Sequence, residues 1–342
     1  PNANATANPT ADATANPTSS VTETPGTFVD TTIGRITIGH EETLTIENVN
    51  KTVNVFLGVP FAEPPVNQLR FRKPVPKKRL SMTLHANTIP NQCMQVANQT
   101  IMSEDCLYLN AWVPENTIGV ENITLPIMVW IYGGGFGAGS INLYTGKYLA
   151  AAENVIVFAM NYRLGAFGFL AADTKVIKGN YGLYDQQLAL KWIKDNAKAF
   201  GGDPDRITIF GESAGGASVS LQMLNDESRK YFTRGIMQSG SALSRWAVPL
   251  DFDSNIKISE EFLLKNLKCV PSKHGNFDEI LKCAQSVSAM EIIKQQIAVD
   301  GIKPLGIEFQ PVVDGEFIDQ HPLLEAALGK YVAKEMMIGV NE

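Results

Sequence analysis

Apolar residues form three continuous runs in the middle of the chain, at residues 127–132, 155–160 and 207–210. Runs without polar alternation are typical of buried parallel strands that helices cover on both faces of the sheet. A helix is predicted over residues 184–200, where apolar side chains recur near one helix face and charged ones lie elsewhere. This succession predicts an α/β domain with a mostly parallel central sheet.

The pattern changes on both sides of this core. Residues 32–38, 43–46 and 53–59 are short β-rich runs separated by Gly, Asn and charged residues, which predicts antiparallel edge strands. Residues 255–300 have the apolar spacing of further helices, and residues 309–315 are predicted to form a strand that runs into a turn.

The first 26 residues differ from the rest, because nearly all of them are Asn, Ala, Thr, Pro or Ser. Such a segment cannot bury enough apolar surface to fold. We therefore expect a disordered arm over residues 1–26 and one α/β domain over residues 27–342.

Composition narrows the function classes. The chain has 342 residues, of which 44% are hydrophobic and 19% charged, as in a globular protein with a large core. A formal net charge of -6 argues against nucleic acid as a partner. No apolar run reaches the roughly 18 residues of a membrane-spanning helix. We expect no metal or cofactor, and a homo-oligomer is left open.

Cysteines and glycosylation motifs indicate the compartment. The four cysteines form two local pairs by their spacing, which suits two short disulfide loops, although four reduced core cysteines are the alternative. The pairs are Cys93 with Cys106 and Cys269 with Cys283. Four asparagines begin N-x-Ser/Thr motifs, which are acceptor sites for N-glycosylation: Asn4, Asn50, Asn98 and Asn122. Together these features predict a secreted or extracellular protein.

A Gly-x-Ser-x-Gly motif is the strongest chemical signal. It is centred on Ser213, directly after the apolar run 207–210 and before a stretch rich in Gly, Ala and Ser. A strand, a tight turn and a helix in this order form a nucleophile elbow, which exposes the serine hydroxyl at the carboxyl edge of the sheet. An ordinary turn is the alternative, but the flanking elements favour a catalytic serine.

A second glycine turn supplies candidate donors for an oxyanion. Gly133, Gly134 and Gly135 end the run 127–132, and their N–H groups can approach a ligand because no Cβ intervenes. We predict an oxyanion hole formed by the N–H groups of Gly134, Gly135 and Ala214. A plain loop or a phosphate cradle are the alternatives, but the chain has no G-x-x-x-x-G-K-[ST] motif.

The sequence offers no convincing catalytic base. In an elbow fold the order is serine, acid and histidine, whereas His40 and His85 precede Ser213. His274 lies between Cys269 and Cys283, and His321 precedes Pro322. We interpret these last two as surface or helix-capping histidines.

Longer segments resemble the type-B carboxylesterases and cholinesterases of the α/β-hydrolase fold. Residues 200–215, FGGDPDRITIFGESAG, are similar to the serine signature of that family, and residues 103–110, SEDCLYLN, to its second signature. The likeness runs from about residue 28 to residue 342. It implies an α/β-hydrolase fold, with antiparallel N-terminal strands and a mostly parallel sheet flanked by helices.

The resemblance also implies residue roles. Ser213 would form an acyl-enzyme whose oxyanion is held by Gly134, Gly135 and Ala214. The two cysteine pairs would be disulfides. It further implies two ion pairs that fix loops rather than catalyse. These are Arg70 with Glu104 and Arg163 with Asp185.

One motif departs from the family pattern. The acid of the family is the glutamate of a motif resembling Gly-Val-Asn-x-x-Glu-Gly, whereas residues 339–342 read Gly-Val-Asn-Glu. Glu342 is out of register for this role. We expect the acid and histidine of the triad, with the last strands and helices, to lie beyond residue 342, and this polypeptide alone to be inactive.

The expected substrate is a small-molecule ester. Cholinesterases hold choline over an indole on the first cysteine loop, but residues 94–105 contain no aromatic residue. A general carboxylesterase is therefore preferred. Trp246 and Phe309 match positions that line the acyl pocket in the family, with core packing as the alternative. Glu212 would strengthen a nearby positive charge or cap the helix after Ser213.

Two other functions are alternatives to a general carboxylesterase. One is a cholinesterase, and the other is a non-catalytic, neuroligin-like adhesion domain of the same fold. Retention of Ser213 and the glycine turn favours an enzyme. A lipase is disfavoured because no large apolar lid stands out.

Overall fold

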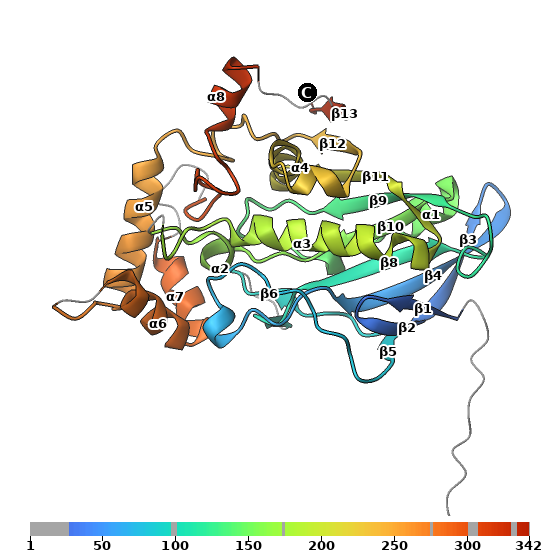
Figure 1. Ribbon diagram of the computed structural model, residues 1–342, viewed down its shortest axis with the longest axis horizontal. Helices are drawn as coiled ribbons and strands as arrows, with labels where there is room; N and C mark the ends of the chain where they lie inside the picture. Colours follow the sequence, from blue (N-terminus) through green and yellow to red (C-terminus); the bar gives the residue numbers. More distant parts are fainter. Residues whose placement is uncertain are drawn as a thin grey trace, which may run out of the picture.

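The computed structural model describes residues 27–96, 101–172, 175–273, 276–299, 307–329 and 334–341. The predicted arm and the predictions for Asn4, Asn98, His274 and Glu342 lie outside the described residues. A mixed eight-stranded sheet forms the centre, in the order β13-β12-β11-β9-β10-β8-β4-β3 (Figure 1). Its strands are β3 (His40–Ile46), β4 (Val49–Pro60), β8 (Tyr108–Pro114), β9 (Leu125–Ile131), β10 (Ile156–Met160), β11 (Gly202–Glu212), β12 (Arg234–Gln238) and β13 (Glu335–Gly339).

The three apolar runs are buried strands, as predicted. They form β9, β10 and β11, which pair in parallel, and β12 and β13 continue the parallel part. Strands β8, β4 and β3 add to β10 in antiparallel order. Because parallel strands share a direction, the carboxyl ends of β9 and β11 meet at one edge of the sheet. The residues that follow both strands therefore come together there.

Helices cover the sheet unequally. Helix α4 (Ala214–Leu224) packs on β9, β11 and β12, α3 (Tyr181–Asn196) contacts α4 and β11, and α1 (Lys147–Glu153) packs on β4, β8 and β10. Alternate residues on β9 and β11, such as Val129 and Ile209, are fully buried. Trp130 and Phe210, which point to the opposite face, are only half-buried.

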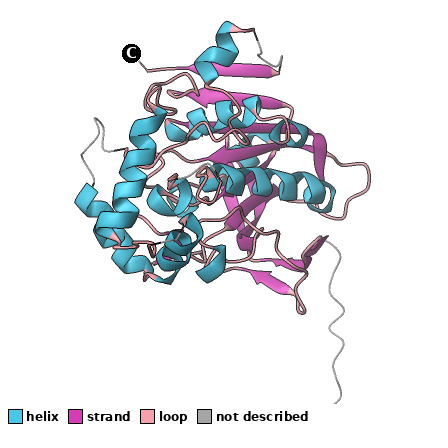
Figure 2. Ribbon diagram, turned by 60° about the vertical axis from the view of Figure 1, so that its left-hand side comes forward, coloured by secondary structure: helices cyan, strands magenta, loops and turns pink. Residues whose placement is uncertain are grey.

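The remaining helices gather at one end of the sheet (Figure 2). They are α2 (Gly165–Phe169), α5 (Phe252–Glu261), α6 (Phe277–Ser286), α7 (Ala289–Val299) and the π-helical turn η5 (Phe262–Asn266), with α8 (Pro322–Ala327) nearer β13. Single 3₁₀ turns are η1 (Asn67–Leu69), η2 (Ile141–Leu143), η3 (Ala197–Phe200) and η4 (Ser228–Tyr231). The helices predicted within 255–300 are confirmed. The predicted helix 184–200 begins three residues earlier, at Tyr181, and its last turn is η3.

Two predictions about strands were wrong. Residues 53–59 lie in β4, which is not an edge strand because β3 and β8 pair with its two sides. Residues 32–38 contribute β2 (Gly34–Ile38) to a separate sheet with β1 (Phe28–Thr31) and β5 (Leu84–Ala86). Each strand pairs with its neighbour in the chain on one side and with a distant strand, β8 for β4 and β5 for β2, on the other, and local composition did not reveal the distant partner.

Residues 309–315 form a turn but no strand, contrary to prediction. The side-chain amide of Asn180 donates to the Val312 carbonyl at 2.7 Å and accepts from the Val312 N–H at 3.0 Å. This side chain takes the place of a neighbouring strand. Asp314 Oδ1 then accepts N–H groups of Glu316, Phe317 and Ile318 and closes the turn.

Both predicted disulfides are present. Cys93 is bonded to Cys106 and Cys269 to Cys283, and no cysteine is free. Cys93 ends the short strand β6 (Gln92–Cys93), which pairs with β7 (Met102–Ser103). The first disulfide therefore closes a loop whose two ends are also joined by backbone pairing.

Glu316 gives a testable pH dependence. Its carboxylate pairs with Lys178 and with Lys73, and these hydrogen bonds lower its pKa to about 2. Because the folded pKa lies below the value of 4.5 of a free carboxyl, the pairs stabilise the fold above about pH 4.5 and this stabilisation is lost as pH falls towards 2. The side chain is 38% exposed, so we expect Glu316→Gln to cost about 1 kcal/mol or less at pH 7. Urea unfolding at pH 7 and pH 2.5 measures this, with the exposed Glu121→Gln as control. An unchanged cost at both pH values would contradict the assignment.

Candidate active site

Ser213 occupies a strained turn between β11 and α4. Its backbone has φ 55° and ψ -121°, a region that residues other than glycine rarely adopt and that costs about 1–3 kcal/mol. The Ser213 N–H donates to the Gln238 carbonyl at 2.8 Å, which ties the turn to the neighbouring strand β12. The structure therefore has the elbow conformation that the motif predicts.

Close backbone contacts around the elbow require two glycines. A Cβ on Gly215 would lie 2.0 Å from the Ile131 carbonyl oxygen, at the end of β9. A Cβ on Gly240 would lie 2.0 Å from the Ser213 carbonyl oxygen. Gly215 belongs to the motif, but sequence reasoning missed Gly240, because only the pairing of β11 with β12 brings it to Ser213.

The predicted oxyanion turn lies against this elbow. A Cβ on Gly133 would be 3.1 Å from the Ser213 Cβ and 2.5 Å from the Glu212 carbonyl oxygen. Gly134 and Gly135 both have positive φ, 104° and 60°. The Gly134 carbonyl accepts the N–H groups of Gly137 and Ala138. These bonds fold the segment into a compact turn beside Ser213.

Three N–H groups at the site have no partner within the described part of the chain. They belong to Gly134, Gly135 and Ala214, none of which donates a hydrogen bond to a described residue. Ala214 is the first residue of α4, and the N-terminus of a helix favours negative charge. The geometry thus fits the stabilisation of an oxyanion next to the serine.

The structure separates the two predicted acyl-pocket residues. Trp246 is half-buried, with its ring centroid 6.4 Å from that of Phe136 in the glycine turn. Phe309 is 3% exposed and packs edge-on against Phe262 at 5.1 Å, so it belongs to the core. Ile307, two residues earlier, lies closer to the turn, because its side chain is 3.5 Å from the position of a Cβ on Gly135. Sequence reasoning missed Ile307.

Glu212 adds a negative charge at the rim of the site. It is exposed, and its carboxylate would lie 3.1 Å from a Cβ on Gly133. Partial burial, and to a lesser extent the Glu212 carboxylate, raise the pKa of the Tyr144 phenol. Tyr144 in turn packs against Trp130, with ring centroids 5.1 Å apart.

The described histidines have other partners. His40 contacts Glu42, and His85 contacts Thr37. His321 caps α8, as predicted, by accepting the Leu323 N–H, and its other nitrogen lies 3.2 Å from the Val248 carbonyl oxygen. Within the described ranges, Ser213 therefore has no hydrogen bond to a histidine.

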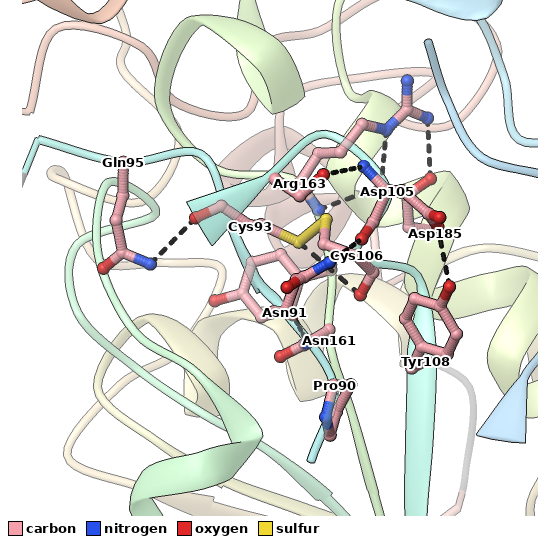
Figure 3. The surroundings of a disulfide bond; sticks show 12 residues. Pro90, Asn91, Cys93, Gln95, Asp105, Cys106, Tyr108, Asn161, Arg163 and Asp185 are labelled. Carbon is pink, nitrogen blue, oxygen red and sulfur yellow. Dashed lines mark hydrogen bonds and ion pairs between the residues drawn. A yellow bond between two sulfur atoms is a disulfide. The ribbon is translucent and has the colours of Figure 1, made fainter. Parts of the chain in front are cut away.

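Both predicted ion pairs are present and buried. Arg70 donates twice to Glu104, each bond 2.6 Å long, and Arg163 donates to Asp185 at 2.7 and 2.6 Å. Figure 3 shows Arg163 and Asp185 near the disulfide Cys93–Cys106. The side chains of Arg163 and Asp185 are 3% and 0% exposed. Both pairs join segments distant in sequence, which suits a structural role.

Comparison with known proteins agrees with this architecture. The model of the carboxylesterase family matches residues 25–342. The chain belongs to the carboxylesterase family. The mixed sheet with its flanking helices is accordingly the α/β-hydrolase fold of that family.

Individual relatives are similar over most of the chain. A cholinesterase from Mus musculus is 42% identical over 325 residues, which cover 89% of this chain and 52% of the mouse protein. An acetylcholinesterase from Danio rerio is 42% identical over 85% of this chain and 47% of its own length. The chain thus spans about half the length of the curated relatives that it matches.

The described residues of this carboxylesterase-family chain show neither a membrane-spanning helix nor a metal-binding cluster. No helix in them is both long and apolar enough to cross a membrane. No group of three His, Cys, Asp or Glu side chains in them is arranged to hold a metal ion.

Proposed function

We propose that the protein hydrolyses small carboxylic esters with Ser213 as nucleophile. The observation that carries the proposal is the strained Ser213 beside the N–H groups of Gly134, Gly135 and Ala214, which have no hydrogen-bond partner among the described residues. Backbone strain of this kind is retained where it serves a function. Membership of the carboxylesterase family supports the reaction class.

The proposed reaction has two steps. The Ser213 oxygen attacks the ester carbonyl carbon while a base takes the hydroxyl proton, and the oxyanion accepts hydrogen bonds from the three N–H groups. The alcohol leaves with that proton, and the acyl group stays on Ser213. Water then attacks the acyl-enzyme and releases the acid. We infer that the base is supplied from outside the described residues, because Ser213 has no hydrogen bond to a histidine among them.

Covalent labelling tests this function against the adhesion alternative. A fluorophosphonate probe reacts only with an activated serine. We expect the protein at its natural length to be labelled at Ser213 and to hydrolyse nitrophenyl acetate. A folded protein of natural length that stays unlabelled would favour a non-catalytic adhesion domain.

A cholinesterase is the second candidate, favoured by the relatives and by the Glu212 carboxylate, whose charge contributes to raising the pKa of the Tyr144 phenol. An aromatic ring and a carboxylate together can bind a quaternary ammonium group. We prefer a general carboxylesterase because residues 94–105, the first cysteine loop, contain no aromatic side chain. Comparing kcat/KM for acetylthiocholine and for an uncharged acetate ester decides between them.

Ile307 should limit the size of the acyl group of the ester that the site accepts. We infer that its side chain, next to Gly135, limits the space beside the oxyanion turn. Ile307→Phe is expected to lower kcat/KM for a butyrate ester about tenfold relative to an acetate ester. Phe309→Leu, at the core position, is the control and should leave this ratio unchanged. An equal effect on both esters would argue that Ile307 does not face the acyl group.

We also propose an extracellular location and glycosylation. Two disulfides are typical of proteins that fold in an oxidising compartment. Asn50 and Asn122, in two of the glycosylation motifs, are exposed and accessible to a glycan. Digestion of secreted protein with an N-glycosidase, followed by mass measurement, tests both points.

A further inference from the structure

Gln95 connects the first disulfide loop to the oxyanion turn. Its side-chain amide donates to the Gly139 carbonyl at 2.9 Å and accepts the Gly139 N–H at 3.0 Å. The same amide nitrogen donates to the Cys93 carbonyl at 3.0 Å, and Figure 3 shows this bond beside the disulfide. Gln95 is only 1% exposed. One buried side chain therefore binds both backbone groups of Gly139 and the backbone of Cys93.

Gly139 is where the oxyanion turn ends. The turn is closed by the bonds from Gly137 and Ala138 to the Gly134 carbonyl. Gly139 itself has φ 128° and packs so closely that a Cβ would lie 2.5 Å from the Tyr132 ring. Tyr132 is fully buried and stacks on Tyr162. Gly139 is thus held between a rigid aromatic side chain and the amide of Gln95.

A shift of Gly139 would reach the catalytic donors directly. Only four peptide units separate Gly139 from Gly135, and the turn bonds make the intervening residues move with Gly134. The position of the donors matters because a misplacement of about 1 Å at a catalytic site can reduce the rate roughly 100-fold. A displacement of Gly139 therefore displaces the N–H groups of Gly134 and Gly135 that would form the oxyanion hole.

We propose that Gln95 is a positioning residue, which holds the Gly134 and Gly135 N–H groups in register with Ser213 by fixing Gly139. The proposal rests on the proposed esterase function. It gives the Cys93–Cys106 loop a role in catalysis without contact with the substrate. Gln95 touches neither Ser213 nor the oxyanion donors in any hydrogen bond of the described residues.

Only a side chain with a donor and an acceptor can perform this role. In Gln95→Met the volume is similar, but the Gly139 N–H and the two carbonyls lose their partner. In Gln95→Glu the acceptor for Gly139 is kept, but a carboxylate oxygen faces the carbonyls of Gly139 and Cys93. In Gln95→Asn the amide is one methylene shorter and cannot reach both backbone segments.

The first arm of the test measures catalysis by the protein at its natural length. We expect Gln95→Met and Gln95→Glu to lower kcat for nitrophenyl acetate about 10- to 100-fold. Gln285→Met is the matched control, because the Gln285 amide also donates to two backbone carbonyls, those of Gln68 and Arg70, at 3.0 and 2.9 Å. It should leave kcat within about twofold. Gln95→Asn replaces Gln95→Met if the latter does not fold.

The second arm measures the turn itself and needs no activity. Hydrogen exchange of the Gly137, Ala138 and Gly139 amides should become faster in Gln95→Met and stay unchanged in Gln285→Met. Unchanged exchange in the turn, or faster exchange with unchanged kcat, would overturn the proposal. A wild-type protein that hydrolyses no ester would instead reject the proposed function, while the exchange data still decide whether Gln95 holds the turn.

Discussion

Ser213→Ala is expected to abolish fluorophosphonate labelling and to reduce kcat for nitrophenyl acetate about 10⁶-fold in the protein at its natural length. Removing the nucleophile of a serine hydrolase has an effect of this order, because the remaining oxyanion donors accelerate only attack by water. Ser241→Ala, a nearby half-buried serine outside the elbow, is the matched control. It should keep both labelling and turnover. Labelling that persists in Ser213→Ala would show that another residue is the nucleophile.

The elbow strain adds a stability measurement to the same position. The φ of 55° and ψ of -121° at Ser213 are strained for alanine as for serine, but accessible to glycine. We therefore expect relief of the strain to raise the free energy of unfolding of Ser213→Gly by about 1–3 kcal/mol relative to Ser213→Ala. The greater backbone entropy of glycine in the unfolded chain offsets part of this difference. Guanidinium unfolding of the two variants gives this difference. If alanine is the more stable, the turn is not strained as the structure indicates.

Local sequence signals predicted the elbow because its causes are local. Gly215 and Ser213 lie in one short motif, and the strand and helix that fix them are adjacent in the chain. The three apolar runs identified the parallel strands for the same reason. The glycine turn at Gly134 and Gly135 also follows directly from β9. These parts of the fold needed no information about distant contacts.

Features that depend on distant partners escaped prediction. β4 has the local composition of an edge strand, but β3 and β8 pair on both its sides. The segment around Phe309 was predicted to be a strand, but the Asn180 side chain rather than a neighbouring strand binds Val312. Because the segment forms no strand, the sequence could not show that Ile307 lies beside Gly135 while Phe309 lies in the core. Gln95 shows no motif at all, since its role depends on Gly139, 44 residues away.

Asp185→Asn is expected to give the largest loss of stability, about 3–5 kcal/mol. Asp185 is fully buried and accepts from the Arg163 side chain twice and from the Arg163 backbone N–H at 3.0 Å. Replacing the carboxylate leaves an uncompensated guanidinium in the interior, which costs more than the pair itself contributes. Guanidinium unfolding measures the loss. Asp203→Asn, which breaks the exposed pair with Arg206, is the control and should cost about 1 kcal/mol or less.

The double variant Arg163→Met with Asp185→Leu separates the cost of a buried unpaired charge from the value of the pair. It removes both charges and retains apolar volume, so its loss should be smaller than that of Asp185→Asn alone. The stability that the double variant still loses then comes from the backbone N–H of residue 163, which no longer has the Asp185 carboxylate as its acceptor. If the losses of stability in Arg163→Met and in Asp185→Leu simply add up to the loss in the double variant, Arg163 and Asp185 act independently, contrary to their geometry.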